Sequence, residues 1–204
     1  MADLEHVDAD GRRARRDRGR EAVIEALFEL LREGAVSLRA DAIVERSGVS
    51  LSSIFRYFSS IDDLQRETID RYFERFAPRF EIPAIGKGAL ADRVRRYVDA
   101  RLDLYEAIAP IGRLARVRAR EHPRIGASLQ ETRTRLAAQV VTHFQPEIRQ
   151  RSPAQADDLV ALVATMTSFE AWDLLSESHQ RSRSQIRRAW ITATRALFEL
   201  RGAS

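Results

Sequence analysis

The sequence of 204 residues contains no cysteine, which excludes disulfide bonds, thiolate metal sites and cysteine nucleophiles together. It has only 9 glycines and 6 prolines, and 44% of its residues are hydrophobic, so it contains enough apolar material for a folded core. Asparagine is absent, and Lys87 is the only lysine, so nearly every cation is an arginine. Because the net charge is only +4, local clusters of charge must indicate any polyanionic partner.

Long hydrophobic runs are also lacking. Apolar stretches such as residues 159–166 fall short of the ~20 residues that span a bilayer. The first ten residues are acidic and contain no apolar segment of the kind found in a secretory signal. We therefore expect a cytoplasmic protein that does not enter a membrane.

The usual motifs of catalytic and metal sites are missing as well. Neither His-Glu-x-x-His nor Gly-x-Ser-x-Gly occurs, and Gly86-Lys87-Gly88 lacks the other residues of a phosphate-binding loop. No histidine has a second histidine four residues away; the four are His6, His122, His143 and His179. We expect no metal, no cofactor and no enzymatic activity.

A basic segment near the start is the first positive feature. It contains six arginines and a single acid, Asp17; the arginines are Arg12, Arg13, Arg15, Arg16, Arg18 and Arg20. Such a segment is either a solvated tail or an arm that neutralises DNA phosphates. We expect residues 1–19 to form a flexible basic arm.

Three short helical patterns follow the basic segment. Apolar residues at helical spacing predict helices over residues 21–34, 37–46 and 50–58. Ser37 and Ser50 are suitable caps for the second and third helices, and the first two are expected to end at glycines, Gly34 and Gly48. Two short helices around a glycine-containing turn outline a helix-turn-helix.

At these residues the chain resembles the tetracycline-repressor (TetR) family of bacterial transcription regulators. The residues that carry the resemblance are Ala26-Leu27, Leu30, Gly34, Ile43 to Ser50, Ile54 to Phe58, and Leu64. The motif covers residues 20–66. The resemblance implies a homodimer that binds a palindromic DNA operator through this domain, usually as a repressor, and that a small-molecule effector releases.

The resemblance and the side-chain chemistry together give a set of DNA-contact candidates. Serine hydroxyls can bond base edges or phosphates, and Ile54 with Phe58 would anchor the third helix in a small core. By the resemblance, Tyr57 bonds a phosphate and Phe55 touches a thymine methyl, although both rings could instead complete the core. The candidates are Arg16, Arg18, Arg39, Ser50, Leu51, Ser52, Ser53, Phe55 and Tyr57.

The sequence departs from the family pattern at three places. Ile61 replaces a lysine that usually contacts phosphate, Phe55 replaces a tyrosine, and Arg39 lies where a serine or threonine is usual. A fourth helix opened by Ser59 or Ser60 could still direct backbone amides at a phosphate. An alternative therefore stays open: a helical ligand-binding or adaptor protein with a degenerate helix-turn-helix that no longer binds DNA.

The rest of the chain also has helical periodicity, so the predicted class is all-α with about nine helices. Prolines and glycines between residues 78 and 88 mark a linker. We expect a helix-turn-helix domain over residues 20–66 and an effector-binding and dimerisation domain over 67–204. The further helices are predicted at 61–76, 90–108, a short one after a break at 110–112, 123–144, 154–178 and 184–200.

The last two predicted helices are apolar on two faces. Such helices need two partners, so we expect one face to pack on its own subunit and the other on a second subunit in a four-helix bundle. The alternative is that both helices lie inside a monomer. The interface candidates are Trp172, Leu175, Trp190 and Leu197.

The helices between residues 61 and 144 are expected to enclose the effector cavity. Arg101 interrupts an apolar face and requires an anion, which is either a ligand carboxylate or a neighbouring acid such as Asp103 or Glu106. His143 is either a ligand contact or a hydrogen-bonded core histidine, and the aromatic rings favour an apolar or aromatic ligand unless they are simply core. The candidates are Phe73, Phe76, Tyr97, Arg101, Tyr105, His143 and Phe144.

Overall fold

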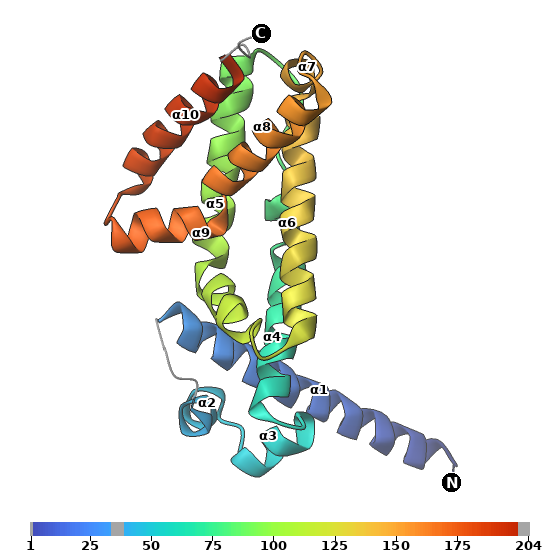
Figure 1. Ribbon diagram of the computed structural model, residues 1–204. Coiled ribbons are helices and arrows are strands. Elements are labelled where there is room, and N and C mark those ends of the chain that lie inside the picture. Colours follow the sequence, from blue (N-terminus) through green and yellow to red (C-terminus); the bar gives the residue numbers. More distant parts are fainter. Residues whose placement is uncertain (1, 34–38, 200–204) are drawn as a thin grey trace. The chain divides into compact units, whose positions relative to one another are not determined.

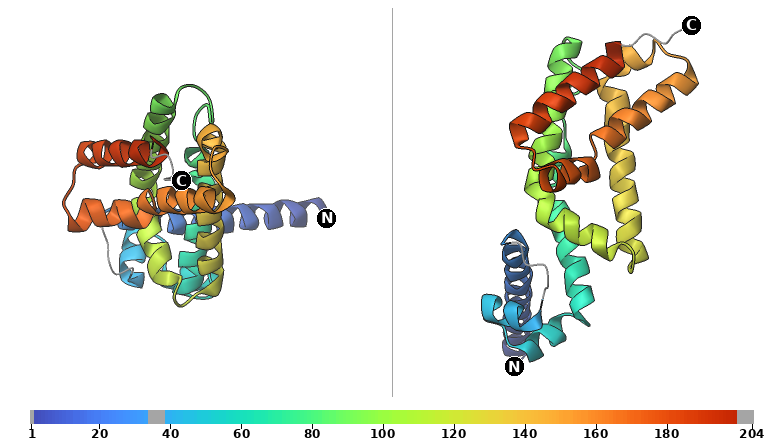
Figure 2. Two further views of the ribbon diagram at one scale, coloured as in Figure 1. Left: turned by 45° about the horizontal axis from the view of Figure 1, so that its top comes forward. Right: turned by 60° about the vertical axis from the view of Figure 1, so that its left-hand side comes forward.

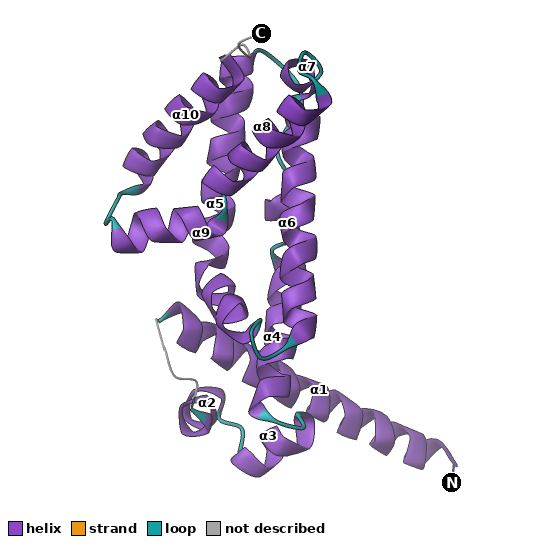
Figure 3. Ribbon diagram, in the orientation of Figure 1, coloured by secondary structure: helices purple, strands orange, loops and turns teal. Residues whose placement is uncertain are grey.

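The computed structural model describes residues 2–33 and 39–199, with side chains from residue 13 onward. Every regular element in these ranges is helical (Figures 1 and 3), which confirms the predicted all-α class. The chain divides into two compact units, one ending at Glu74 and the other starting at Arg75. The first unit thus extends beyond the boundary expected after residue 66.

The described part of the first unit contains four helices. They are α1 (Ala2–Arg32), α2 (Ala40–Ser47), α3 (Leu51–Tyr57) and α4 (Ile61–Arg75). Apolar side chains at helical spacing build its core, which includes Val23, Leu27, Leu31, Ile43, Ile54, Phe58 and Leu64. The edge of one aromatic ring packs on another between α1 and α4, where the centroids of Phe28 and Tyr72 are 4.9 Å apart.

The beginning of α1 differs from the expectation. The helix starts at Ala2, so the basic segment belongs to α1 and is not a separate flexible arm. Helix-forming alanine and arginine dominate residues 12–16, which favours continuation of the helix toward the N-terminus. The predicted end at Gly34 and cap at Ser37 lie outside the described residues, and Arg39 occupies the N-cap position of α2 without a side-chain cap.

The turn between α2 and α3 forms as its sequence predicts. Gly48 adopts the left-handed conformation at φ 67° and ends α2, with its amide bonded to the carbonyl of Val44. Ser50 caps α3 by accepting a hydrogen bond from the amide of Ser53. These two local signals fix the direction in which α3 leaves the turn.

The second unit is built around one long helix. Its elements are the 3-10 turn η1 (Ala77–Phe80), α5 (Leu90–Arg118), α6 (Pro123–His143), α7 (Gln145–Ile148), α8 (Pro153–Met166), α9 (Phe169–Asp173), the π-helical turn η2 (Leu174–Ser178) and α10 (Arg183–Glu199). Helices α6, α9 and α10 all contact α5; α6 runs alongside α5 in Figure 1, and α10 lies obliquely against it (Figures 1 and 2).

Two predicted helix boundaries in this unit are wrong. The helix expected to break at 110–112 continues as α5 through Pro110, because Ile111 and Ala115 keep its apolar face buried beyond the proline. The single helix expected over 154–178 is broken after Met166, where Ser168 caps α9 by accepting a hydrogen bond from the amide of Ala171.

Residues 153–178 also bear on the expectation about membranes. By length and composition this segment could cross a bilayer, and 28% of its tested window is buried. Core helices of soluble proteins can have the same length and composition, so the segment is weak evidence of a membrane span. The structure divides it into α8, α9 and η2.

Candidate functional site

Helix α3 has one buried side and one exposed side. Ile54 and Phe58 are 0% and 1% exposed and form its anchor, as the sequence predicts. On the other side, Leu51 is 45% and Phe55 is 49% exposed. The phenyl ring of Phe55 is therefore not part of the three-helix core, which removes one of the two interpretations of this residue.

Hydroxyl and guanidinium groups lie beside these exposed apolar side chains. The hydroxyl of Ser50 is 3.2 Å from that of Ser52 and 3.1 Å from that of Ser53, and Arg56 donates to the Ser53 hydroxyl at 3.2 Å. Sequence reasoning missed Arg56, although it is a cation inside the candidate recognition helix. The face thus combines donors, acceptors and apolar groups, which are the groups that read base edges in a major groove.

Tyr57 is held at the side of α3 by α1. A Cβ atom added at Gly19 would lie 2.6 Å from the Tyr57 hydroxyl oxygen, so the ring lies against the bare backbone of Gly19. The guanidinium of Arg56 lies over the same ring, 5.5 Å from its centroid. Tyr57 is half-buried and is fixed by these two neighbours.

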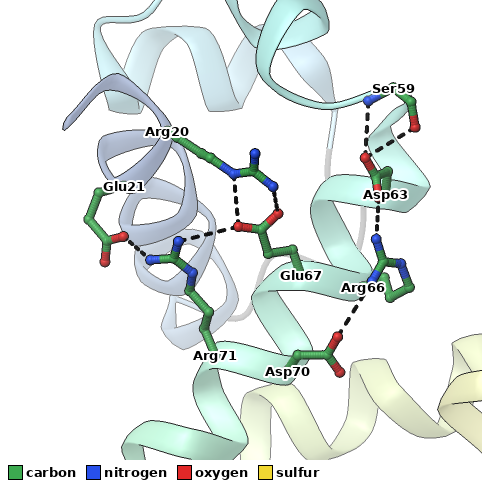
Figure 4. Close-up of polar contacts among 8 residues, drawn as sticks. All are labelled: Arg20, Glu21, Ser59, Asp63, Arg66, Glu67, Asp70 and Arg71. Carbon is green, nitrogen blue, oxygen red and sulfur yellow. Dashed lines mark hydrogen bonds and ion pairs between the residues drawn. The ribbon is translucent and has the colours of Figure 1, made fainter. Parts of the chain in front are cut away.

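The arginines of the basic segment differ in role. Arg16 and Arg18 are exposed on α1. Arg20 instead pairs with Glu67 of α4 (Figure 4), and its guanidinium lies 5.0 Å from the centroid of the Phe58 ring. Arg20 therefore joins α1 to α4, and Arg16 and Arg18 stay exposed to solvent.

The start of α4 is less open to a phosphate than the sequence suggests. Ser60 accepts a hydrogen bond from the Asp63 amide at 3.0 Å, and Asp63 in turn accepts bonds from the amide and hydroxyl of Ser59, both at 3.1 Å (Figure 4). The hydrogen bonds from Arg66 and from the Ser59 amide lower the pKa of Asp63, which keeps it ionised. With Asp62 beside it, the first turn carries two acids where a phosphate would bind.

Arg39 lies just before α2 and is exposed. Its guanidinium pairs with Asp41 at 3.2 Å. An exposed pair of this kind contributes little to stability, about 0–1 kcal/mol, so a phosphate can compete with the carboxylate for Arg39.

The second unit contains a cavity of about 580 Å³ among α5, α6, α8 and α9. This volume lies within the ~300–1,000 Å³ range of small-molecule sites. Three effector candidates line it, Tyr97, Arg101 and Tyr105 of α5. Residues that the sequence analysis did not select complete the lining: Gln130, Arg133, Thr134, Leu136, Ala137, Ala161, Ala164, Thr165, Ser168 and Glu170.

Arg101 has different partners from those expected. It donates to the side-chain oxygen of Gln139 at 2.9 Å and to the carbonyl of Leu136 at 3.0 Å. The anticipated pairing with Asp103 or Glu106 is wrong, because both of these acids bind Arg183 of α10. Asp103 and Glu106 lie on the outer face of α5, which α10 covers.

His143 is a hydrogen-bonded core histidine, one of the two interpretations of the sequence. It is 0% exposed; Nδ1 accepts from the Gly86 amide at 3.1 Å, and Nε2 lies 2.9 Å from the Arg93 carbonyl. Burial, together with the charges of Arg96, Arg93 and Arg101, lowers its pKa, so the ring is neutral. The effector candidates outside the cavity lining are Phe73, Phe76, His143 and Phe144.

The four dimer-interface candidates differ in their exposure. Trp172 and Trp190 are 6% and 2% exposed within a single protomer, so the prediction that they form an intersubunit surface is wrong. Both rings pack against Tyr105, with centroid distances of 6.2 Å and 6.4 Å. Leu175 and Leu197 are half-buried.

Acidic and histidine side chains do not gather into a metal site in the described part of the chain, where no group of three or more is placed to hold an ion. Comparison of the sequence with protein-family models and with curated proteins gives no match.

Comparison with solved structures shows a shared fold. A TetR-family transcriptional regulator from Streptomyces coelicolor is 18% identical with a TM-score of 0.65, covering 89% of this chain and 81% of its own. A transcriptional regulator from Rhodococcus is 16% identical with a TM-score of 0.62 over 90% and 96% of the two chains. A proposed TetR-family regulator from Mesorhizobium loti is 17% identical with a TM-score of 0.57 over 90% and 95%. The chain therefore has the fold found in TetR-family regulators.

Proposed function

We propose that this protein is a DNA-binding transcription regulator that reads its operator with α3. The observation that carries the proposal is the two-sided character of α3. Ile54 and Phe58 are buried, while Leu51 and Phe55 are 45% and 49% exposed beside serine hydroxyls and Arg56. A short helix with this division, following a tight turn, suits insertion into a major groove. The fold shared with solved transcriptional regulators supports the same function.

The other DNA contacts have distinct roles in this proposal. Arg16 and Arg18 on α1 neutralise phosphates, and Arg39 exchanges Asp41 for a phosphate. Tyr57 donates its hydroxyl to a phosphate, and the exposed α3 side chains contact bases. The hydroxyls of Ser50, Ser52 and Ser53 add adaptable donors and acceptors.

We infer that a small molecule controls the binding of the dimer to DNA. The protein acts in the cytoplasm as a homodimer on a palindromic operator, because two recognition helices on one symmetric assembly match two half-sites. As a repressor, the protein blocks transcription while it is bound to the operator, and a small molecule in the second-unit cavity releases it. The size and mainly apolar lining of the cavity support this part.

Selection of DNA duplexes from a random pool, followed by mobility-shift titration, tests the proposal. We expect a palindromic sequence to be enriched, and Phe55→Ala and Ser52→Ala each to cost about 1–3 kcal/mol of affinity for it. Deletion of residues 1–18 should reduce the slope of affinity against salt. The matched control is Val141→Ala, an exposed apolar residue of α6, which should bind unchanged.

A different result would favour the adaptor function. Asp62 and Asp63 in the first turn of α4, with Ile61 before them, are the observation in its favour, since they disfavour a phosphate there. If no duplex is enriched and the deletion leaves the salt slope unchanged, the helix-turn-helix does not bind DNA and the proposal fails.

A further inference from the structure

The charges around the second-unit cavity do not balance. Three charged residues line it: Arg101, Arg133 and Glu170. Glu170 accepts hydrogen bonds from Arg133 at 2.6 Å and from Arg116 at 2.9 Å. Its carboxylate is therefore shared by two arginines and is not left to compensate a third.

Of these lining residues, Arg101 is the cation that has no acidic partner in the described part of the chain. It is 1% exposed, and its guanidinium donates to the neutral oxygens of Gln139 and Leu136. The described acids nearest in sequence on α5 are Asp99, which binds Arg187, and Asp103, which binds Arg183. A buried guanidinium held only by neutral acceptors attracts an anion strongly, because little water is present to solvate the charge.

Gln139 fixes the direction of this guanidinium. Its amide nitrogen donates to the carbonyl of Phe80 at 2.7 Å, which turns its oxygen toward Arg101. The Tyr97 ring lies below the guanidinium, 4.8 Å from its carbon to the ring centroid. Arg101 is therefore held in place at the wall of the cavity before any ligand arrives.

The hydroxyl protons of the two tyrosines that line the cavity already take part in hydrogen bonds within the protein. The hydroxyl of Thr167 donates to the carbonyl of Val163 at 2.7 Å, so the contact of 2.6 Å with Tyr97 leaves Tyr97 as the donor. Tyr105 donates to the Thr167 carbonyl at 2.8 Å. Both rings therefore present mainly apolar surface to the cavity, alongside Ala161 and Ala164.

We propose that this cavity binds a small monocarboxylate with an apolar body, its carboxylate on Arg101 and its body against the Tyr97 and Tyr105 rings. The three charged lining residues carry a net charge of +1, which favours a ligand with one negative charge, and the alanine and tyrosine lining favours a hydrocarbon or aromatic remainder. The inference rests on the proposed function only where it makes this acid the effector; binding itself requires no DNA.

Matched pairs of compounds test the inference on the full-length protein without DNA. Benzoate is compared with benzamide, and octanoate with octanamide, by calorimetric titration and thermal shift. We expect each acid to bind about tenfold more tightly than its amide, because a charge-assisted hydrogen bond to Arg101 is lost in the amide. Equal affinities within a pair, or no binding of either acid at millimolar concentration, would overturn the proposal.

Variants assign the preference to one arginine. Arg101→Gln should bring acid and amide to within about twofold of each other. Arg133→Gln is the matched control, because it removes a lining arginine that already has an acidic partner in Glu170, and it should keep the tenfold preference. Should Arg101→Gln fail to fold, Gln139→Glu supplies a fixed carboxylate beside Arg101 and should abolish the preference. Retention of the preference in a folded Arg101 or Gln139 variant would contradict the assignment.

A separate mobility-shift titration distinguishes the two proposals. If the acids bind but do not release a selected DNA duplex, the cavity assignment stands and the effector role fails. If no duplex is enriched while the acid preference is present and depends on Arg101, only the proposed regulatory function fails.

Discussion

At the residue scale, one glycine determines where a candidate DNA-contact side chain lies. Gly19 of α1 leaves room for the Tyr57 ring, since a Cβ atom there would lie 2.6 Å from the hydroxyl oxygen and 2.9 Å from a ring carbon. A glycine inside a helix otherwise costs roughly 0.5–1 kcal/mol relative to alanine. At this position the missing side chain allows the close approach of α1 and α3.

Gly19→Ala should therefore separate stability from DNA binding. The added methyl group displaces the Tyr57 ring, while the gain in helix propensity offsets part of the lost packing. We expect a small change in the free energy of unfolding and a loss of roughly 1–3 kcal/mol in operator affinity, measured by urea titration and mobility shift. The control Ala22→Gly alters α1 but adds no atom against Tyr57, so an equal loss of affinity in both variants would refute the positioning role.

At the element scale, ion pairs tie α1 to α4 within the first unit (Figure 4). Glu67 of α4 binds Arg20 of α1 and lies 3.4 Å from Arg71, which in turn pairs with Glu21. The Glu67 side chain is only 15% exposed, so its removal leaves Arg20 partly buried without its partner. The hydrogen bond to Glu67, the largest influence, raises the pKa of Arg20.

Glu67→Gln and Asp70→Asn should therefore have different effects, although both change a carboxylate of α4 into an amide. We expect Glu67→Gln to lower the free energy of unfolding by about 1–2 kcal/mol. Asp70→Asn should change it by less than about 0.5 kcal/mol, because burial and the neighbouring Glu74 and Glu67 raise the pKa of Asp70 and the folded state gains little from its charge. Chemical denaturation measures the free energy of unfolding of both variants. If both lose a comparable amount, the ion pair between α1 and α4 does not stabilise the unit more than an exposed carboxylate does.

Sequence patterns predicted those elements whose signals are local. The left-handed Gly48 and the Ser50 cap define the helix-turn-helix, so the positions of Ile54, Phe55 and Phe58 followed from spacing alone. The break before α9 was missed because the apolar pattern continues through it. Its local signal was the cap at Ser168.

Long-range contacts account for what the sequence could not reveal about the candidate sites. The partners of Arg101 come from α6, and the acids expected to pair with it bind α10 instead. In the sequence, Arg20 does not differ from the other arginines of the basic segment, because its partner Glu67 is far away along the chain. Periodicity identifies which side chains point inward on a helix, but not which element supplies their partners.

At the scale of the whole molecule, the proposed dimer requires a surface other than the tryptophans. On α8, Leu162 is 56% exposed and Asp158, four residues earlier, is also exposed, so we propose this face of α8 as the interface. Trp190 of α10 is 2% exposed and belongs to the protomer core. A surface leucine and a core tryptophan should therefore respond differently to substitution.

Leu162→Glu should give a folded monomer, because it places a charge at the proposed interface and leaves the protomer core unchanged. Trp190→Ala should instead lower the free energy of unfolding by about 3–5 kcal/mol, as expected for a large core side chain. Sedimentation velocity and urea titration separate these effects. A dimeric Leu162→Glu protein with unchanged affinity between subunits would place the interface elsewhere.

The response of the second unit to acid follows from two groups with shifted pKa values. Burial raises the pKa of Glu170, but the hydrogen bonds from Arg116 and Arg133 outweigh it and lower the pKa from 4.5 to about 2. Burial lowers the pKa of His143 below 6.5. In both cases the unfolded chain binds the proton more readily, so stability must fall as the pH falls.

We therefore expect two stages of acid destabilisation. The first begins as the pH drops through 6.5, where the unfolded chain protonates His143 more readily than the folded chain does, and the second extends from pH 4.5 toward about 2. Urea unfolding at a series of pH values can be followed by tryptophan fluorescence, because Trp172 and Trp190 both lie in the second unit. His143→Gln, whose amide can still accept from Gly86 and donate to Arg93, should remove the first stage alone. Glu170→Gln should remove the second. If both variants follow the wild-type curve at every pH, other groups control the acid response and the two assignments are wrong.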